Sequence, residues 1–268
     1  MNLTELELNY DKYLSLNYNS KDTISSYKNC FKKFVNENDR VYRLSNEYLK
    51  DYFISFNEKY SASYYNQMLS SLIIVYKILK QPRKLSGISY KKDHPKHIVI
   101  LSRKEIIDSL KVIQNIKHKW LIKLLYIGAL RSAELLNIKI TDIDSANNRI
   151  SINNGKGGFS RYIPITDEDI DDLRQYFKKY RPITYLFEGQ KEGNPYTKTS
   201  LRKVVLKIQT SKHVHPHLLR HTAITNLVDD GHNLLKVQNF AGHKTPKSTN
   251  RYYHLSEDAL SGMMLKTA

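Results

Sequence analysis

The sequence predicts a mainly α-helical protein with a small antiparallel β-sheet, divided into two domains. Three observations predict this class. Residues 1–92 carry apolar side chains at helical spacing, residues 138–165 alternate apolar and polar side chains as strands do, and residues 166–255 return to helical spacing. A chain of 268 residues is long enough to bury the cores of two modest domains or of one large one.

Residues 1–82 are predicted to form four helices. Ser20 or Asp22 can cap the second helix, Ser45 the third, and Ser61 or Ser63 the fourth. Because the connections are short, we expect a small helical bundle. The many aromatic residues of this region sit at helical spacing, so we expect them in its core and not on a base-stacking platform.

Residues 83–100, RKLSGISYKKDHPKHIVI, are predicted to be an interdomain linker. The segment contains Gly87 and Pro95 and has no helical period. Its cations are candidates for contacts with phosphate groups, although a solvated linker would have the same composition. These candidate DNA-binding residues are Arg83, Lys84, Lys91, Lys92 and Lys96.

Residues 101–268 are predicted to form a second domain. We expect one helix from about Ser102 and another through Trp120 to Ile127. Three strands then follow in IKITDID, in RISIN and, after a Gly-rich turn, in GKGGFSRYIPI. Further helices are expected at 166–180, 198–209, 217–228, 233–240 and around 248–255.

The charge of the chain predicts a polyanionic partner. There are 43 Lys and Arg against 26 Asp and Glu, a net charge of +17. Residues 1–92 contribute +6 (15 minus 9) and residues 93–268 contribute +11 (28 minus 17). Nucleic acid is the first candidate and a membrane surface the second. Since both parts are basic, we expect both domains to face the polyanion.

Several classes of protein are disfavoured. No run of 18 apolar residues indicates a membrane span, and MNLTELELNYDKYL lacks the basic start and apolar stretch of a secretory signal. We therefore expect a soluble, cytoplasmic protein with no membrane partner. The single cysteine, Cys30, is expected to be a small buried residue. Without a zinc-ligand spacing, a GxGxxG motif or a Walker loop, no metal or cofactor is expected.

Two arginine-containing segments are candidates for an anion site. In HPHLLRHT, Pro216 suits the first turn of a helix, and His217 and Arg220 then share a face near the positive end of that helix. A solvated basic face would give the same pattern. Arg131 lies in an apolar setting, where it can hold a phosphate or form an ion pair with Glu134.

Three further positions are less distinctive alone. Lys156 stands in the turn NGKGG, as an ordinary exposed hairpin lysine also could. His243 follows a glycine at a predicted helix end, which is typical of a helix C-cap. Tyr252 and Tyr253 form a pair that begins nine residues after His243.

In this order the motifs resemble the tyrosine recombinases, the phage integrase family of site-specific DNA recombinases. GALRSAEL resembles the first arginine box, GKGGFSRYIPI the lysine-bearing hairpin, HPHLLRHT the HxxR box, and FAGH with STNRYYH the second histidine and the tyrosine box. The resemblance covers roughly residues 97–260. Ala129 and Phe159 depart from the usual pattern, and neither is a catalytic position.

The resemblance implies a fold and a reaction. It implies an N-terminal core-binding, SAM-like helical bundle and an α+β catalytic domain with a C-terminal tail. It implies a DNA strand-breaking and rejoining enzyme that forms a covalent 3′-phosphotyrosyl intermediate without metal or ATP. The implied catalytic residues are Arg131, Lys156, His217, Arg220, His243 and Tyr252.

Within the resemblance, each residue has an expected role. Arg131 and Arg220 would stabilise the charge on the attacked phosphate, and Lys156 would protonate the leaving 5′-oxygen. His217 would accept a proton or bind the phosphate, and His243 would support the site. The family spacing selects Tyr252 as the nucleophile, and a helical Tyr253 would point about 100° away.

The resemblance also implies partners. Family members clamp double-stranded DNA at a specific site, usually as a homotetramer on two sites, with a C-terminal segment that packs on a neighbour. A chain starting directly with the helical bundle favours a simple recombinase over a large phage integrase. A type IB topoisomerase and a non-catalytic, site-specific DNA-binding protein remain alternatives, and retention of all six polar residues argues against the second.

Overall fold

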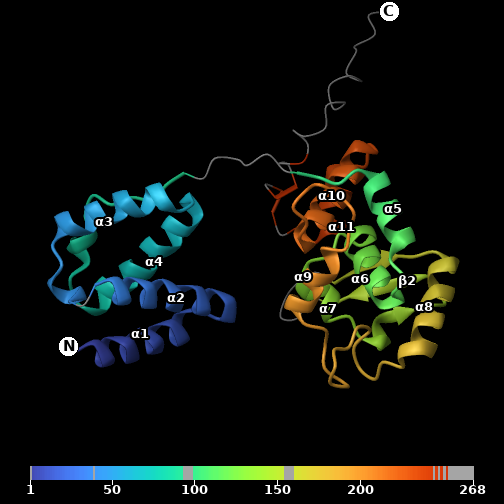
Figure 1. Cartoon of the computed structure of the whole chain (residues 1–268), viewed down its shortest axis with the longest axis horizontal. Helices are drawn as coiled ribbons and strands as arrows, with labels where there is room; N and C mark the ends of the chain where they lie inside the picture. The colour runs from blue at the N-terminus through green and yellow to red at the C-terminus, as the bar shows by residue number, and fades with distance from the viewer. Residues whose placement is uncertain are drawn as a thin grey trace, which may run out of the picture. The chain divides into compact units, whose positions relative to one another are not determined.

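The computed structural model describes residues 2–38, 40–92, 99–153, 160–243, 245–246, 248–249 and 252. The chain divides into two compact units, Met1–Lys96 and His97–Ala268, each of which is described by itself (Figure 1). In the described part, no helix is long and apolar enough to cross a membrane.

The first unit contains the four predicted helices. They are α1 (Leu3–Asn17), α2 (Lys21–Glu37), α3 (Asn46–Lys59) and α4 (Ala62–Ile78), with a short 3-10 turn η1 at Val41–Arg43. Among the alternative caps, Ser20, Ser45 and Ser61 accept the capping hydrogen bonds of α2, α3 and α4. The prediction of four helices is therefore confirmed.

Many aromatic residues of this unit lie in its core, as predicted, although Tyr42, Tyr48, Tyr60 and Tyr90 are exposed. Tyr10 of α1 is fully buried and stacks on Phe31 of α2, with ring centroids 4.6 Å apart. Its hydroxyl lies 2.7 Å from the Ser71 hydroxyl and donates to the backbone oxygen of Tyr27 at 3.3 Å. A buried tyrosine needs such polar partners, and here helices α1, α2 and α4 supply them.

Much of the predicted linker belongs to the first unit. Residues 82–85 form a 3-10 turn, η2 (Pro82–Leu85), that packs on α3 and α4, and Leu85 is buried in the core of the unit. Asn66 also bonds to both backbone groups of Lys91. Leu85 and the partly buried Ile88 attach this segment to the core, although its glycine, proline and charges are typical of a linker. Residues 93–98 lie outside the described part of the chain.

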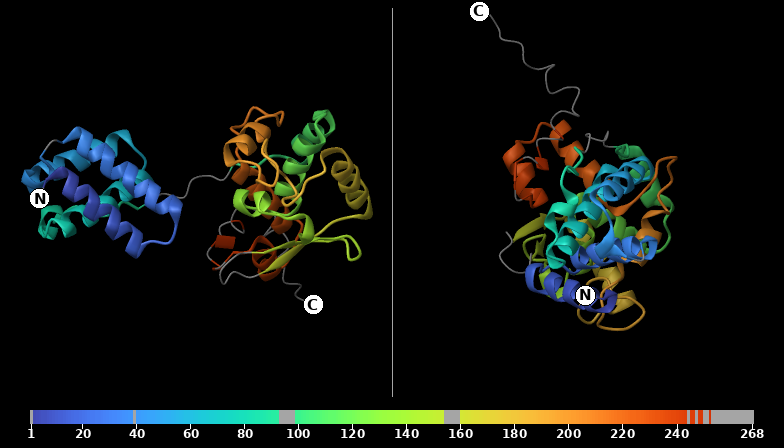
Figure 2. Two further views of the ribbon diagram at one scale, coloured as in Figure 1. Left: turned by 90° about the horizontal axis from the view of Figure 1, so that it is seen from below. Right: turned by 90° about the vertical axis from the view of Figure 1, so that its left-hand side faces the viewer.

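In the described part of the second unit, three α-helices precede a three-stranded sheet and further helices follow it. Figure 2 shows the sheet with the helices around it. The first part comprises α5 (Arg103–Val112), α6 (Ile116–Ile127), α7 (Ser132–Leu136), η3 (Ile140–Asp142), β1 (Ile143–Asp144), β2 (Arg149–Ile152) and β3 (Arg161–Pro164). The second part comprises α8 (Asp167–Tyr180), α9 (Lys198–Val205), α10 (Pro216–Asp229) and α11 (Leu234–Ala241). The prediction of a mainly α protein with a small antiparallel sheet is confirmed.

The sheet has the order β1-β2-β3 with antiparallel pairs, and Ile150 of β2 faces Ile163 of β3. The first predicted strand, residues 138–144, is mostly wrong. Residues 140–142 form a 3-10 turn because the Asp142 carboxylate accepts from the Lys139 backbone N–H and stabilises a turn in place of a ladder. Helix α7 was not predicted, and α9 ends before the expected position.

The core of the second unit lies around α6, whose residues Trp120, Leu121 and Leu125 are buried. Helix α10 packs on α6, and α11 packs on β3. The start of α7 is therefore near α10, the end of α11 and β3. This arrangement brings segments that are far apart in sequence to one place, and the candidate site forms there.

Candidate active site

Arg131 stands at the start of α7, where a capping interaction fixes its backbone. The Glu134 carboxylate accepts from the Arg131 backbone N–H at 2.9 Å. The Arg131 guanidinium donates to Glu134 Oε1 at 2.7 Å and to the Gly242 carbonyl at 3.0 Å. The ion-pair alternative for Arg131 is therefore present in the structure. About 39% of the side chain is exposed, so the guanidinium also keeps an open side.

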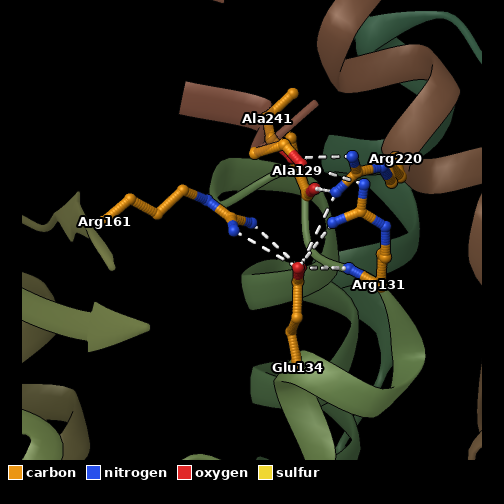
Figure 3. Close-up of polar contacts among 7 residues, drawn as sticks. Ala129, Arg131, Glu134, Arg161, Arg220 and Ala241 are labelled. Carbon is orange, nitrogen blue, oxygen red and sulfur yellow. Dashed lines mark hydrogen bonds and ion pairs between the residues drawn. The ribbon is translucent and has the colours of Figure 1, made fainter. Parts of the chain in front are cut away.

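Glu134 is the centre of an arginine cluster (Figure 3). Besides Arg131, it binds Arg161 of β3 through both carboxylate oxygens, at 2.9 and 3.3 Å, and lies 3.7 Å from the Arg220 guanidinium. Burial opposes the charge of Glu134, but the bonds from Arg161 and Arg131 outweigh it and hold the pKa at about 2. Glu134 is therefore ionised at neutral pH.

Arg220 of α10 is almost completely buried, and backbone carbonyls hold its guanidinium. One nitrogen donates to the Ala129 carbonyl and another to the Ala241 carbonyl at 2.7 Å. Ala129 adopts a left-handed conformation with φ of 45°, and Ala241 is the last residue of α11. Burial and the nearby Arg131 lower the Arg220 pKa to about 10, so the side chain is still cationic at neutral pH.

Gly242 allows the end of α11 to approach this cluster. It has φ of 63°, and a Cβ atom there would lie 2.7 Å from a terminal nitrogen of Arg161. Its carbonyl is also the acceptor for Arg131. Two physical requirements therefore explain a glycine before His243. The helix end is left-handed, and the backbone approaches two arginines closely.

Tyr252 lies beside the arginines with its ring fully buried. It packs in an apolar cluster with Ala129 and Ala241, the residues whose carbonyls hold Arg220. Its hydroxyl oxygen is 2.5 Å from Nδ1 of His221, which follows Arg220 on α10. The structure therefore joins the predicted nucleophile to a histidine that was not among the predicted catalytic residues.

The histidine rings form a series around Tyr252. The His221 ring centroid lies 5.8 Å from that of Tyr252, and the His217 centroid lies 6.3 Å from that of His221. On the other side the His243 ring stacks on Tyr252 at 6.3 Å, and its Nδ1 lies 2.7 Å from the Thr249 hydroxyl. His217 is exposed in the first turn of α10, whereas His221 and His243 are partly buried.

Four of the six predicted catalytic residues therefore meet at one place. Arg131, Arg220, His243 and Tyr252 share contacts, and His217 lies one turn before His221. Lys156 and Tyr253 lie outside the described residues. In the described part, no group of His, Cys, Asp and Glu side chains is placed to hold a metal ion.

Sequence reasoning missed three contributors to the site. Glu134 was considered only as a partner of Arg131. Arg161, which lies in GKGGFSRYIPI, and His221, which lies in HPHLLRHT, received no role. The signal available for Arg161 and Glu134 was charge inside otherwise apolar segments.

The candidate DNA-contact residues of the first unit have different surroundings. Arg83, Lys91 and Lys92 are exposed, whereas Lys84 donates to the Leu44 carbonyl at 2.6 Å. Lys91 also lies over the Tyr65 ring, 5.6 Å from its centroid. Lys96 lies outside the described residues. The bond to the Leu44 carbonyl gives Lys84 a structural role in its own unit.

Comparison with known proteins identifies the family of the chain. The family model for the phage integrase family matches residues 100–258, more than half of the chain. The chain belongs to the phage integrase family. The matched segment includes Arg131, Arg220, His243 and Tyr252, so the polar cluster lies inside the family's own domain.

Relatives within the phage integrase family include two kinds of curated protein. A putative integrase/recombinase, y4eF of Sinorhizobium fredii, is 30% identical over 59% of this chain and 64% of its own length. A second protein from that organism, y4qK, matches over 53% of its length, so the chain spans little more than half of it. The tyrosine recombinase XerC of Bacillus subtilis is 27% identical over 96% of this chain and 90% of its own.

Solved structures of integrases share the fold. The Tn1549 transposon integrase in complex with transposon right end DNA matches with a TM-score of 0.73, covering 96% of this chain and 97% of that one at 21% identity. XerH recombinase bound to a palindromic difH substrate matches with a TM-score of 0.73 over 89% of this chain and 78% of that one, at 22% identity. The mainly α architecture is therefore that of the integrase family.

Proposed function

We propose that this protein is a site-specific DNA recombinase that cleaves and rejoins DNA strands through a covalent 3′-phosphotyrosyl intermediate. Membership of the phage integrase family supports the reaction class. The observation that carries the proposal is the contact of the Tyr252 hydroxyl with His221 beside a cluster of arginines. It places a candidate nucleophile and an imidazole next to an anion site.

The chemistry follows from these groups. The Tyr252 oxygen attacks a DNA phosphorus atom, and the 5′-oxygen leaves as a hydroxyl. A second 5′-hydroxyl reverses the step on another strand, so the energy of the bond is conserved. Arg131 and Arg220 bind the non-bridging oxygens, where negative charge builds up in the transition state. Each such donor can lower the barrier by roughly 3 kcal/mol.

Three further residues have proposed roles. Lys156, which lies in the sequence between β2 and β3, protonates the leaving 5′-oxygen. His217, exposed at the start of α10, binds the phosphate from that helix end. His243, stacked on Tyr252 and in contact with Thr249, supports the nucleophile.

The proposed partner is double-stranded DNA at a specific site, bound by four protomers on two sites. The Tn1549 integrase and XerH structures contain DNA, which supports the class of partner. We assign residues 1–82 and the exposed cations Arg83, Lys91 and Lys92 to DNA binding. Since these cations would contact phosphates, DNA affinity is expected to fall steeply with salt.

The decisive experiment traps the covalent intermediate. A binding site is first selected from a pool of random DNA, then nicked next to the cleavage position so that the short product diffuses away. We expect the wild-type protein to form a denaturation-resistant adduct with this suicide substrate. Tyr252→Phe should form none, and the matched variant Tyr253→Phe should form it normally. Absence of adduct with wild-type protein on its selected site would refute the proposal.

The topoisomerase alternative is tested on the same protein preparation. A supercoiled plasmid without the selected site should stay supercoiled, while a plasmid with two sites should yield recombinant products. Relaxation of the site-free plasmid with no recombinants on the second plasmid would assign the chain to the topoisomerase class instead.

A further inference from the structure

The hydroxyl of Tyr252 and the imidazole of His221 form a hydrogen bond for which the proposed roles give no function. The distance from Nδ1 to the hydroxyl oxygen is 2.5 Å, and the ring planes are inclined by 40°. We infer that His221 is a further catalytic residue, which accepts the proton of Tyr252 when the hydroxyl attacks the DNA phosphate. This inference rests on the proposed function, because it assigns a base to the proposed nucleophile.

His221 is held rigidly. Its neighbour Arg220 is anchored by two backbone carbonyls, and Leu218 and Leu219 are buried in the core of the unit. These three neighbours fix the rotation of α10 about its axis and therefore the direction of the His221 side chain. A base that is already positioned transfers a proton without a prior conformational step.

Tyr252 is held equally well. Its ring is fully buried among small side chains of α10 and α11, including Ala223 and Ala241. The His243 ring stacks on it with an angle of 10° between the planes. The phenol is therefore confined between two imidazoles, and its oxygen is aimed at His221. The contact lies within the distance required for direct proton transfer.

As the bond between the Tyr252 oxygen and phosphorus forms, the phenolic proton moves to Nδ1 of His221, which becomes an imidazolium. The bond from phosphorus to the 5′-oxygen breaks, and that oxygen takes a proton from the general acid, proposed to be Lys156. In the rejoining step an attacking 5′-hydroxyl loses its proton to the lysine, and His221 returns its proton to the departing Tyr252 oxygen.

This assignment separates the functions of the three histidines. His217 lies one turn earlier on α10, exposed, with its ring centroid 6.3 Å from that of His221. That position is suited to the phosphate, which must approach from outside. His221 then acts on the nucleophile, and Arg220, which precedes it, places a positive charge close to the phenolate as it forms.

The test compares two substitutions of His221 in single-turnover cleavage of the suicide substrate. His221→Asn keeps an oxygen that can accept the Tyr252 hydrogen bond but cannot hold the proton, and His221→Ala removes the contact. We expect both to cleave roughly 100-fold more slowly or worse, the range for loss of a general base. The matched control His213→Ala, at an exposed histidine before α10, should cleave at the wild-type rate.

Folding and positioning are separated from proton transfer by the asparagine variant. We expect His221→Asn to melt near the wild-type temperature and to bind the selected DNA with wild-type affinity. If it also cleaves at the wild-type rate, His221 only orients the hydroxyl and the inference is wrong.

Two chemical rescues then locate the proton. Replacing Tyr252 with 3-fluorotyrosine, whose phenol is more acidic, should restore part of the rate of His221→Asn and leave Lys156→Ala slow. A substrate with sulfur in place of the 5′-bridging oxygen needs no acid, so it should rescue Lys156→Ala and not His221→Asn. Rescue of His221→Asn by the sulfur substrate would place His221 on the leaving group and overturn the inference.

Failure of the inference differs from failure of the proposed function. If the proposed function is wrong, the wild-type protein forms no adduct, or Tyr252→Phe still forms one. If only the inference is wrong, the wild-type protein forms the adduct, Tyr252→Phe does not, and the His221 variants cleave like the wild type.

Discussion

Each unit of this protein contains a buried polar network that ties distant segments together, and the two networks differ in charge. In the helical unit, the Tyr10 and Ser71 hydroxyls bind one another and share the Tyr27 carbonyl. In the second unit, the Glu134 carboxylate binds the guanidinium groups of Arg131 and Arg161, and Arg220 lies close to it.

The neutral network is complete in itself, whereas the ionic one is not. The hydroxyls of Tyr10 and Ser71 both have partners within the helical unit. In the second unit, the ion pairs of the described residues give three arginines one carboxylate, which leaves two positive charges (three minus one) uncompensated. Arg161 Nε is also buried without a hydrogen-bond partner among the described residues. A complete network stabilises a fold, and a surplus of fixed cationic donors provides a site for an anion such as a DNA phosphate.

The largest effect is expected from Glu134→Gln, which removes the single negative charge from the ionic network. The buried arginines Arg161 and Arg220 then repel each other without compensation. We expect a loss of about 3–5 kcal/mol in the free energy of unfolding, measured by urea denaturation. Glu168→Gln, at an exposed position on α8, is the matched control and should cost little. A cost near zero for Glu134→Gln would show that the cluster does not depend on this carboxylate.

The same residue gives the stability a pH dependence of known sign. Because the folded pKa of Glu134, about 2, lies below its ordinary value of 4.5, its contribution is complete above about pH 4.5 and is lost as the pH falls toward 2. Glu105, also with a pKa of about 2, adds to this slope. The wild-type protein should therefore lose stability more steeply than Glu134→Gln between pH 5 and 3, by about 2 kcal/mol over that interval.

The helices of the first unit and the motif residues of the second could be predicted from the sequence better than the ionic network could. The four helices of the first unit follow from strong apolar periodicity and serine caps such as Ser45 and Ser61, which are local signals. The resemblance to the family supplied Arg131, Arg220 and Tyr252. What remained hidden depends on tertiary contacts, since Arg161 and Glu134 are 27 positions apart and meet only after β3 and α7 have packed.

Local competition explains the errors in secondary structure. Residues 138–144 alternate as a strand does, yet Asp142 stabilises a turn at Lys139 and shortens β1 to two residues. Helix α7 has five residues, too few to show a period. His221 received no role because HPHLLRHT shows only its spacing to His217, whereas its contact with Tyr252 joins residues 31 positions apart.

An intermediate effect is expected from Gly242→Ala, which tests how closely the end of α11 fits the arginines. A Cβ at Gly242 would strain the backbone and displace Arg161, whose terminal nitrogen would be 2.7 Å away. Gly231 has a similar φ of 76° but no atom within 4 Å of an added Cβ, so Gly231→Ala measures the strain alone, about 1–2 kcal/mol. We expect Gly242→Ala to cost more than Gly231→Ala in urea denaturation and to slow cleavage selectively. Equal effects of the two variants would show that the arginines tolerate the added methyl group.

The smallest effect is expected from Tyr10→Phe in the neutral network, and it completes the comparison with Tyr252. Both rings are fully buried, and burial raises the pKa of Tyr10, so its hydroxyl stays protonated over the working pH range. Removing this hydroxyl leaves the Ser71 bond to the Tyr27 carbonyl intact, so we expect a cost of about 1 kcal/mol in unfolding free energy and normal adduct formation. Tyr42→Phe, at an exposed tyrosine, is the control and should change neither quantity. Tyr252→Phe should do the reverse, with little change in stability and no adduct. Loss of adduct in a folded Tyr10→Phe protein would mean that the neutral network also serves the reaction. The hydrogen-bond partner of a buried tyrosine would then not suffice to distinguish a structural hydroxyl from a reactive one.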